Sequence, residues 1–296
     1  DLENSIISGT GIEPVKSFIS SESTYSNQKQ NRSTVQSDYV LPLGKSSQFE
    51  AGFRGNYLTL LSEYRVEEDL LGDGNFTVNT NFTNTLEYKE NVSALYSQFG
   101  SKINKFSYLI GMRFEDSKIV INQLTTQDLN KKKYNNFFPS AFLTYEIKDG
   151  SSVSLNYSKR ITRPRGRFIN PFSSYSSNIN LFVGNPDLDP SYSDAFDMGY
   201  LKKWNKVTLS TSLYYNKTTG SFQVVRIESG RFIGDVPVVL NTPFNLATDD
   251  KIGFEFTLNY TPYKWWKLNG NFNFFSNKTD GKYTYTKSSN EIETID

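Results

Sequence analysis

Hydrophobic and polar residues alternate along most of this chain with a period of two residues. Between residues 106 and 115, Phe106, Ile110 and Phe114 fall on one face, whereas Ser107 and Arg113 fall on the other. Alternation of this kind is typical of β-strands with one apolar and one solvated face. The same pattern is clear at residues 48–57, 152–158, 208–216, 252–260 and 266–274, and weaker at 31–42, 84–99, 136–147 and 194–202. The pattern predicts an all-β chain of about ten strands.

The connections between these strands alternate in length. Short polar turns are predicted near residues 44, 103, 149, 205 and 263, and long polar loops at residues 62–82, 116–134, 160–192 and 217–245. Strands of about 15 residues are longer than those of most soluble sheets, and about 9–11 tilted residues cross a bilayer. We therefore expect an antiparallel transmembrane β-barrel segment with short periplasmic turns and long extracellular loops. A soluble β-sandwich also alternates and remains the alternative.

A barrel of this kind would expose its apolar positions to lipid. We expect the lipid-facing surface to include Phe53, Ile110, Leu155, Leu213, Phe256 and Leu268. The three tryptophans, Trp204, Trp265 and Trp266, lie at or beside predicted short turns. Indole rings favour the boundary between water and lipid, so these residues are predicted to form an interface belt. In the soluble alternative they would pack in a core.

Composition excludes several classes of function. The chain has 296 residues, with 32 Lys or Arg against 31 Asp or Glu, and a charge this close to zero argues against nucleic-acid binding. Histidine and cysteine are both absent, which removes thiolate or imidazole metal sites and nucleophilic triads that use a histidine base. We expect no enzymatic activity, no cofactor and no metal site.

A basic cluster lies in the predicted loop at residues 160–192. It consists of Lys159, Arg160, Arg163, Arg165 and Arg167. Guanidinium groups could bind an anionic ligand or the phosphates of lipopolysaccharide through paired hydrogen bonds. Alternatively, the cluster is a solvated loop whose charges are neutralised by acids such as Asp187 and Asp189.

Three stretches resemble one known family. They read LNYSKRITRP at residues 155–164, INPF at 169–172 and VGNPDLDP at 183–190. Together they are similar to TonB-dependent outer-membrane receptors of the Bacteroidetes type, and the resemblance extends over nearly the whole chain. Asp189 and Ser191 depart from the family, which often has Lys and Glu at those positions.

The resemblance implies a barrel of about 22 strands, closed by a plug domain, that imports a scarce nutrient with energy from the TonB complex. It implies a bacterial outer-membrane location, contact with outer-membrane lipid and lipopolysaccharide, and a surface lipoprotein as a further partner. We expect residues 1–296 to be a partial barrel without the plug domain, with first and last strands that do not pair with each other. An independent outer-membrane channel or adhesin and a soluble β-rich binding module remain alternatives.

Overall fold

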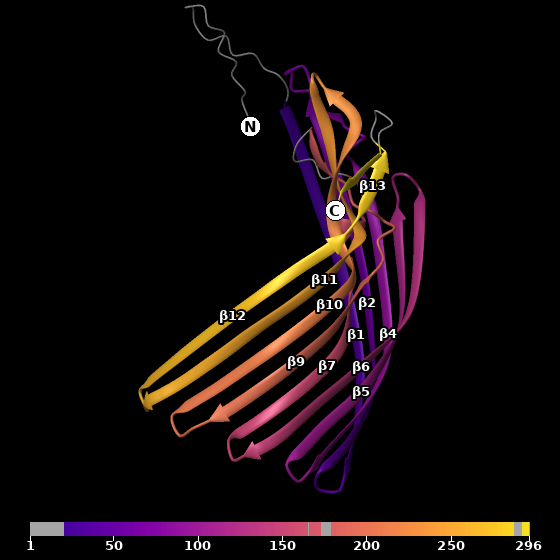
Figure 1. Ribbon diagram of the computed structural model, residues 1–296. Coiled ribbons are helices and arrows are strands. Elements are labelled where there is room, and N and C mark those ends of the chain that lie inside the picture. The colour runs from indigo at the N-terminus through magenta and orange to yellow at the C-terminus, as the bar shows by residue number, and fades with distance from the viewer. Residues whose placement is uncertain (1–20, 165, 173–178, 287–291, 296) are drawn as a thin grey trace, which may run out of the picture.

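The computed structural model describes residues 21–164, 166–172, 179–286 and 292–295. One antiparallel sheet dominates, with ten strands paired in the order β1-β2-β4-β5-β6-β7-β9-β10-β11-β12 (Figure 1). Two short strands join this sheet away from the main path, because β3 pairs with β2 and β8 pairs in parallel with β11. The all-β antiparallel fold predicted from the alternation is confirmed.

The ten principal strands are long. Their bounds are β1 Ser21–Leu43, β2 Ser47–Asp69, β4 Asn84–Ile103, β5 Phe106–Gln123, β6 Asp128–Lys148, β7 Ser151–Thr162, β9 Ser191–Lys203, β10 Val207–Ile233, β11 Val236–Tyr263 and β12 Trp266–Gly281. The minor elements are β3 Thr77–Val78, α1 Gly166–Ile169, β8 Asn180–Phe182, β13 Tyr283–Thr286 and β14 Ile292–Ile295. Across the described part of the chain, no helix has the length and apolar character needed to cross a membrane.

Five tight hairpin turns join successive strand pairs and lie at the same end of the sheet (Figure 1). Gly44, Asn104 and Gly150 have positive φ angles of 76°, 54° and 67° in three of these turns, a conformation that glycine and asparagine tolerate. This edge, which we call the turn rim, comprises residues 43–48, 101–107, 146–151, 202–207 and 262–267. The predicted grouping of all five short turns on one side is confirmed.

At the opposite end, three connections are shorter than predicted. The expected loop at residues 62–82 begins only after Asp69, where β2 ends. The expected loop at residues 116–134 is mostly strand, since β5 continues to Gln123 and β6 begins at Asp128. The expected loop at residues 217–245 is a long hairpin, with only two residues between the end of β10 at Ile233 and the start of β11 at Val236. Short apolar runs such as Ile119–Ile121 and Val238–Leu240 interrupt the alternation of polar and apolar residues there, although the backbones continue the hydrogen-bonded ladder.

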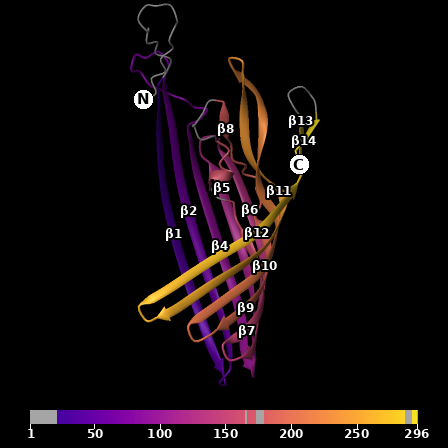
Figure 2. The same ribbon diagram turned by 60° about the vertical axis from the view of Figure 1, so that its left-hand side comes forward.

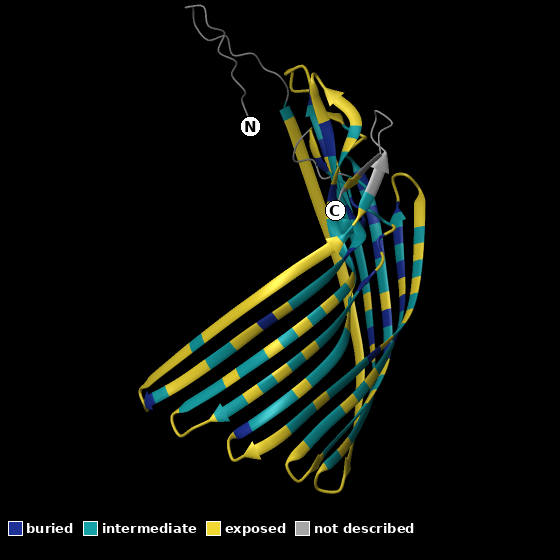
Figure 3. Ribbon diagram, in the orientation of Figure 1, coloured by how far each residue is buried: buried dark blue, intermediate teal, exposed yellow. Residues whose placement is uncertain are grey.

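Strand register assigns side chains to faces, because directly opposite residues point to the same side of an antiparallel sheet. One row runs from Phe53 to Leu95, Phe114 and Phe137 across four strands. We call this side the apolar face and the other the polar face. The six residues predicted to face lipid, Phe53, Ile110, Leu155, Leu213, Phe256 and Leu268, all lie on the apolar face. Figure 3 shows the corresponding alternation of exposure along parts of β9 and β10.

The sheet is curved and open (Figure 2). β1 pairs with β2 and β12 pairs with β11, and among the described residues no ladder joins β1 to β12. This outcome agrees with the expectation that the first and last principal strands do not pair with each other.

Candidate ligand-binding site

The connection between β7 and β9, residues 163–190, folds back over the polar face. We call it the infolded segment; Arg165 and residues 173–178 lie outside the described part of the structure. Ile169 and Leu188 are its apolar anchors, with exposed fractions of 2% and 1%. They share a buried cluster with Leu86, Tyr88, Ile119 and Ile121, which project from the polar faces of β4 and β5. Burial of these side chains stabilises the segment against the sheet.

Backbone contacts hold the two halves of the infolded segment together. The amide of Gly184 donates to the carbonyl oxygen of Asn170 at 2.9 Å, and the amide of Asn185 donates to that of Phe168 at 2.6 Å. A Cβ atom on Gly184 would lie 2.7 Å from both the carbonyl oxygen of Arg167 and the amide nitrogen of Asn170. Only glycine allows this close approach of two backbones.

Two asparagines of the recognised motifs organise the local turns. Asn170 Oδ1 accepts hydrogen bonds from the Phe172 amide at 3.2 Å and from Gln123 Nε2 at 3.1 Å. Asn185 Oδ1 accepts from the Asp187 amide at 2.9 Å, while its Nδ2 donates to the carbonyl oxygen of Pro243 at 3.2 Å. The motif residues therefore build and anchor the segment, a role that asparagine commonly has in turns.

The structure separates the arginines that the sequence placed in one cluster. Arg163 donates to Glu115 and to Ser117 at 2.7 Å each, and its side chain is only 17% exposed. Arg160 contacts the hydroxyl of Ser158 at 3.2 Å, so Arg160 and Arg163 do not converge on one anion site. Among the arginines of the cluster that the structure describes, Arg167 lines a pocket of the infolded segment.

The acids that were expected to neutralise these arginines have other partners. Asp189 accepts hydrogen bonds from Lys132 Nζ at 3.3 Å and from the Tyr134 hydroxyl at 3.2 Å. Asp187 accepts one from Asn130 Nδ2 at 3.3 Å. These contacts tie the end of the infolded segment to β6. In the described part of the chain, no group of three acidic side chains is arranged to hold a metal ion.

A pocket of about 550 Å³ lies between the infolded segment and the polar faces of β1, β2 and β4. Its lining combines hydroxyl, amide and aromatic groups with one guanidinium, and contains no carboxylate. The lining residues are Ser26, Gln28, Leu60, Ser62, Tyr64, Asn84, Leu86, Gly166, Arg167, Asn170, Phe172 and Phe182. The Arg167 guanidinium stacks over the Phe182 ring, with its carbon 4.4 Å from the ring centroid. Such a lining suits a ligand with hydroxyl groups or anionic oxygens.

Sequence reasoning identified Arg167 but missed the strand side of this pocket. Ser62, Tyr64 and Asn84 occupy alternate positions on the polar face of β2 and β4. In the sequence they are ordinary polar residues of alternating strands. Only the folding of the infolded segment over them makes them part of a pocket.

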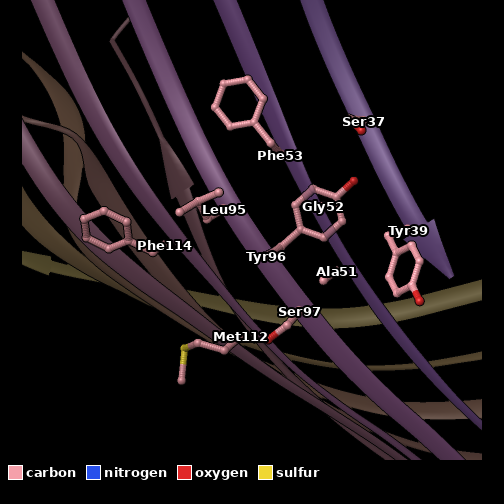
Figure 4. Close-up of a pocket in the computed structure, with 10 residues that line it drawn as sticks. All are labelled: Ser37, Tyr39, Ala51, Gly52, Phe53, Leu95, Tyr96, Ser97, Met112 and Phe114. Carbon is pink, nitrogen blue, oxygen red and sulfur yellow. The ribbon is translucent and has the colours of Figure 1, made fainter. Parts of the chain in front are cut away.

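A second hollow, of about 540 Å³, lies on the apolar face and has a different character (Figure 4). Phe53, Leu95 and Phe114 surround small side chains at Ala51 and Ser97, and no charged group lines the hollow. It is a depression in the surface that was predicted to face lipid.

The tryptophans gather at the turn rim. Trp204 is 53% exposed and Trp265 is 82% exposed. Tyr263, Trp265 and Trp266 form successive stacks, with ring centroids 5.7 and 6.2 Å apart. Their assignment to a membrane interface remains a prediction, and the exposed position of these aromatic rings is compatible with it.

The sequence matches the model of the outer membrane protein beta-barrel family over residues 1–294. A search of curated proteins finds no match. Similar solved structures include the ferric citrate transporter FecA, with a TM-score of 0.62 and 12% identity, where the alignment covers 88% of this chain and 37% of that one. The siderophore receptor PiuA from Acinetobacter baumannii has a TM-score of 0.61 and 12% identity, and the alignment covers 91% of this chain and 41% of that one. The ferric yersiniabactin uptake receptor FyuA from Yersinia pestis has a TM-score of 0.57 and 13% identity, and the alignment covers 87% of this chain and 37% of that one. The chain thus spans about two-fifths of their length.

Proposed function

Because this chain belongs to the outer membrane protein beta-barrel family, we propose that it forms part of the wall of a TonB-dependent receptor that imports a scarce nutrient across the bacterial outer membrane. The observation that carries the proposal is the two-sided sheet. A lipid-compatible apolar face lies opposite a polar face that an infolded segment covers. Membership in this family places the chain in the outer membrane and makes it a barrel protein rather than an enzyme.

The 550 Å³ pocket supports a ligand-binding role for the far end of the sheet. Arg167 is the predicted ligand residue that reaches this pocket, and Asn84 and Tyr64 add polar groups from the wall. The fold likeness to receptors for ferric citrate and siderophores supports uptake of a small nutrient.

The proposed partners follow from the same likeness. The TonB complex would act through a plug domain, which would contact the polar face. Outer-membrane lipid and lipopolysaccharide would surround the apolar face, and a surface lipoprotein of the kind found with Bacteroidetes-type receptors would contact the far end. Residues 1–296 would be a partial barrel that contributes none of the plug.

Uptake in a deletion strain tests the proposal. The deletion should abolish growth on one limiting nutrient among a panel, and the complete gene should restore growth. A protonophore should stop uptake through a TonB-dependent receptor, because TonB draws its energy from the proton gradient. Uptake that continues without the gradient would contradict the proposal and favour the independent channel.

Replacement of pocket residues then tests the ligand site. The variant R167Q should reduce uptake of the identified nutrient by about tenfold if the guanidinium binds it, since a charge-assisted hydrogen bond contributes about 1.5–3 kcal/mol. R160Q is the matched control, because Arg160 is exposed and its side chain donates to the Ser158 hydroxyl instead of lining the pocket. If R167Q takes up the nutrient as fast as R160Q does, Arg167 does not bind the ligand.

A further inference from the structure

The turn rim carries a strong positive charge. It contains nine lysines and two acids, Glu146 and Asp149, whereas the whole chain has a formal charge of +1. The lysines are Lys45, Lys102, Lys105, Lys148, Lys202, Lys203, Lys206, Lys264 and Lys267. The remainder of the chain is therefore net negative, and the positive charge is concentrated at one edge of the sheet.

Little of this charge is neutralised within the rim. Lys102 forms an ion pair with Glu146 at 2.8 Å, the one such pair within the rim among the residues that the structure describes. Lys105 and Lys206 donate to the carbonyl oxygens of Ile147 and Pro262, both at 2.9 Å, which positions the ammonium groups without removing their charge.

The densest part of the rim is formed by the adjacent β9–β10 and β11–β12 turns. The amide of Thr261 donates to the carbonyl oxygen of Lys206 at 2.8 Å, so the two turns are in direct contact. Lys203, Lys264 and Lys267 are exposed there and lie close in sequence to the exposed rings of Trp204 and Trp265. Residues 198–207 and 256–272 contain no acid.

Cations and aromatic rings are in contact in this region. The ammonium of Lys202 lies 5.7 Å from the Trp204 ring centroid, and that of Lys206 lies 5.8 Å from the Tyr263 ring centroid. Indole rings favour the depth of lipid headgroups, and lysine side chains extend from that depth toward phosphates. A surface that combines the two fits the headgroup region of an anionic membrane.

We propose that the turn rim binds anionic phospholipid headgroups, with phosphatidylglycerol preferred over zwitterionic phosphatidylethanolamine. This inference rests on the proposed function, together with the expectation that the short turns of such a barrel lie on the periplasmic side. The phosphodiester would contact the ammonium groups of Lys203, Lys264 and Lys267, while Trp204 and Trp265 insert between headgroups. The rim would thereby fix the depth and tilt of this part of the sheet in the bilayer.

Tryptophan quenching by brominated lipids tests the proposal on the complete receptor in phosphatidylethanolamine vesicles. One vesicle type carries brominated phosphatidylglycerol and the other carries brominated phosphatidylethanolamine at the same mole fraction. The variant W204F/W265F/W266F identifies the share of quenching that arises at the rim. We expect brominated phosphatidylglycerol to quench this share about threefold more efficiently at low salt.

Two sets of lysine variants make the test specific. K203Q/K264Q/K267Q should abolish the preference, and the corresponding Lys→Arg variant should keep it. K29Q/K118Q/K131Q removes equal charge at exposed positions outside the turn rim and should leave the preference intact. If both glutamine variants lose the preference for brominated phosphatidylglycerol to the same extent, the proposal is overturned, because the preference would then depend on the overall charge of the protein.

The two possible failures are distinguishable. Equal quenching by both lipids would overturn the headgroup preference while leaving the rim at the membrane. Absence of quenching by either lipid would overturn the placement of the rim in the bilayer, and with it the orientation on which the proposed function relies.

Discussion

The phenol ring of Tyr96 lies directly over Gly52, its cross-strand partner on the polar face between β2 and β4. A methyl group on Gly52 would overlap this ring, and it would also lie 2.7 Å from the carbonyl oxygen of Ser37. The Tyr96 hydroxyl donates to Asp38, so one aromatic side chain covers β2 and reaches β1. The ring of Tyr214 covers Gly253 in the same way on β10 and β11. The absence of a side chain at these glycines allows aromatic rings to lie flat across neighbouring strands.

We therefore predict that Gly52→Ala destabilises the sheet by about 1–3 kcal/mol, as overpacking typically does. The Tyr96 ring can rotate away, but the Ser37 carbonyl belongs to the β1–β2 ladder and cannot move without disturbing it. Urea unfolding of the complete receptor in lipid vesicles would measure the change. Gly270→Ala is the control, because its nearest neighbour is a Phe272 ring carbon at 3.7 Å. An equal effect of both substitutions would contradict the explanation.

A second prediction concerns the attachment of the infolded segment to β5. Arg163→Met should lower the free energy of unfolding by about 1–3 kcal/mol, because Glu115 is 9% exposed and would keep only Arg113 as an ionic partner. The infolded segment should also become more sensitive to protease, since Arg163 lies at its start. Arg160→Met removes an arginine of the same cluster whose contact is an exposed hydroxyl. If this control is equally destabilised, the buried ion pair is not the cause.

A third prediction concerns the closure of the infolded segment on itself. Gly184→Ala should expose the segment to protease, because the new methyl group would meet the backbones of Arg167 and Asn170 at 2.7 Å. Backbone atoms in this turn cannot move aside as a side chain could. Gly166→Ala is the matched control in the same segment, where the nearest atom is a Leu60 methyl carbon at an ordinary 3.4 Å. Limited proteolysis followed by mass spectrometry would locate the cleavage.

Sequence periodicity was sufficient to predict the hairpins and the apolar face. Residues such as Leu155 and Leu213 alternate with polar neighbours, and that alternation depends only on local strand geometry. It could not predict how far the strands extend. Lys131–Lys133 in β6 are polar on both faces, yet their backbones pair with β5 throughout. Strand pairing there is set by the neighbouring ladder rather than by side-chain hydrophobicity.

The pocket and its supporting contacts depended on tertiary structure. Arg163 and Glu115 are 48 positions apart, and only strand register and the path of the infolded segment bring them together. Leu188 is an isolated apolar residue in a polar stretch and Ile169 lies in the short run Phe168-Ile169, so neither has a repeating pattern that would reveal its burial. The family resemblance located the Asn-Pro-Phe and Gly-Asn-Pro motifs. The structure adds that they form turns and anchors.

A row of alternating charge follows the apolar positions on the apolar face. Lys217 of β10 lies opposite Asp194 of β9 and opposite Asp250 of β11. The row extends to Lys159 on β7 and to Lys278 on β12, so it crosses five neighbouring strands. Between this row and the turn rim, the same face of β11 carries Ile252, Phe254, Phe256, Leu258 and Tyr260. These alternate positions span nine residues, which matches the 9–11 tilted residues that cross the hydrocarbon layer.

The last prediction is that this row marks the outer limit of the hydrocarbon. Leu213→Arg should reduce the free energy of unfolding in lipid vesicles by about 1–4 kcal/mol, because it would place a cation within the hydrocarbon layer, beside Phe254. Lys217→Leu, four residues along the same face, should change it by less than about 0.5 kcal/mol, as expected for a residue already outside the hydrocarbon. Ser210→Arg controls for the effect of a long cation on the polar face of the same strand, where Ser210 is exposed. If Leu213→Arg and Ser210→Arg have the same small effect, the apolar face contacts something other than lipid. If Lys217→Leu instead stabilises the protein strongly, the hydrocarbon extends beyond the charged row, and the boundary lies further toward the infolded segment.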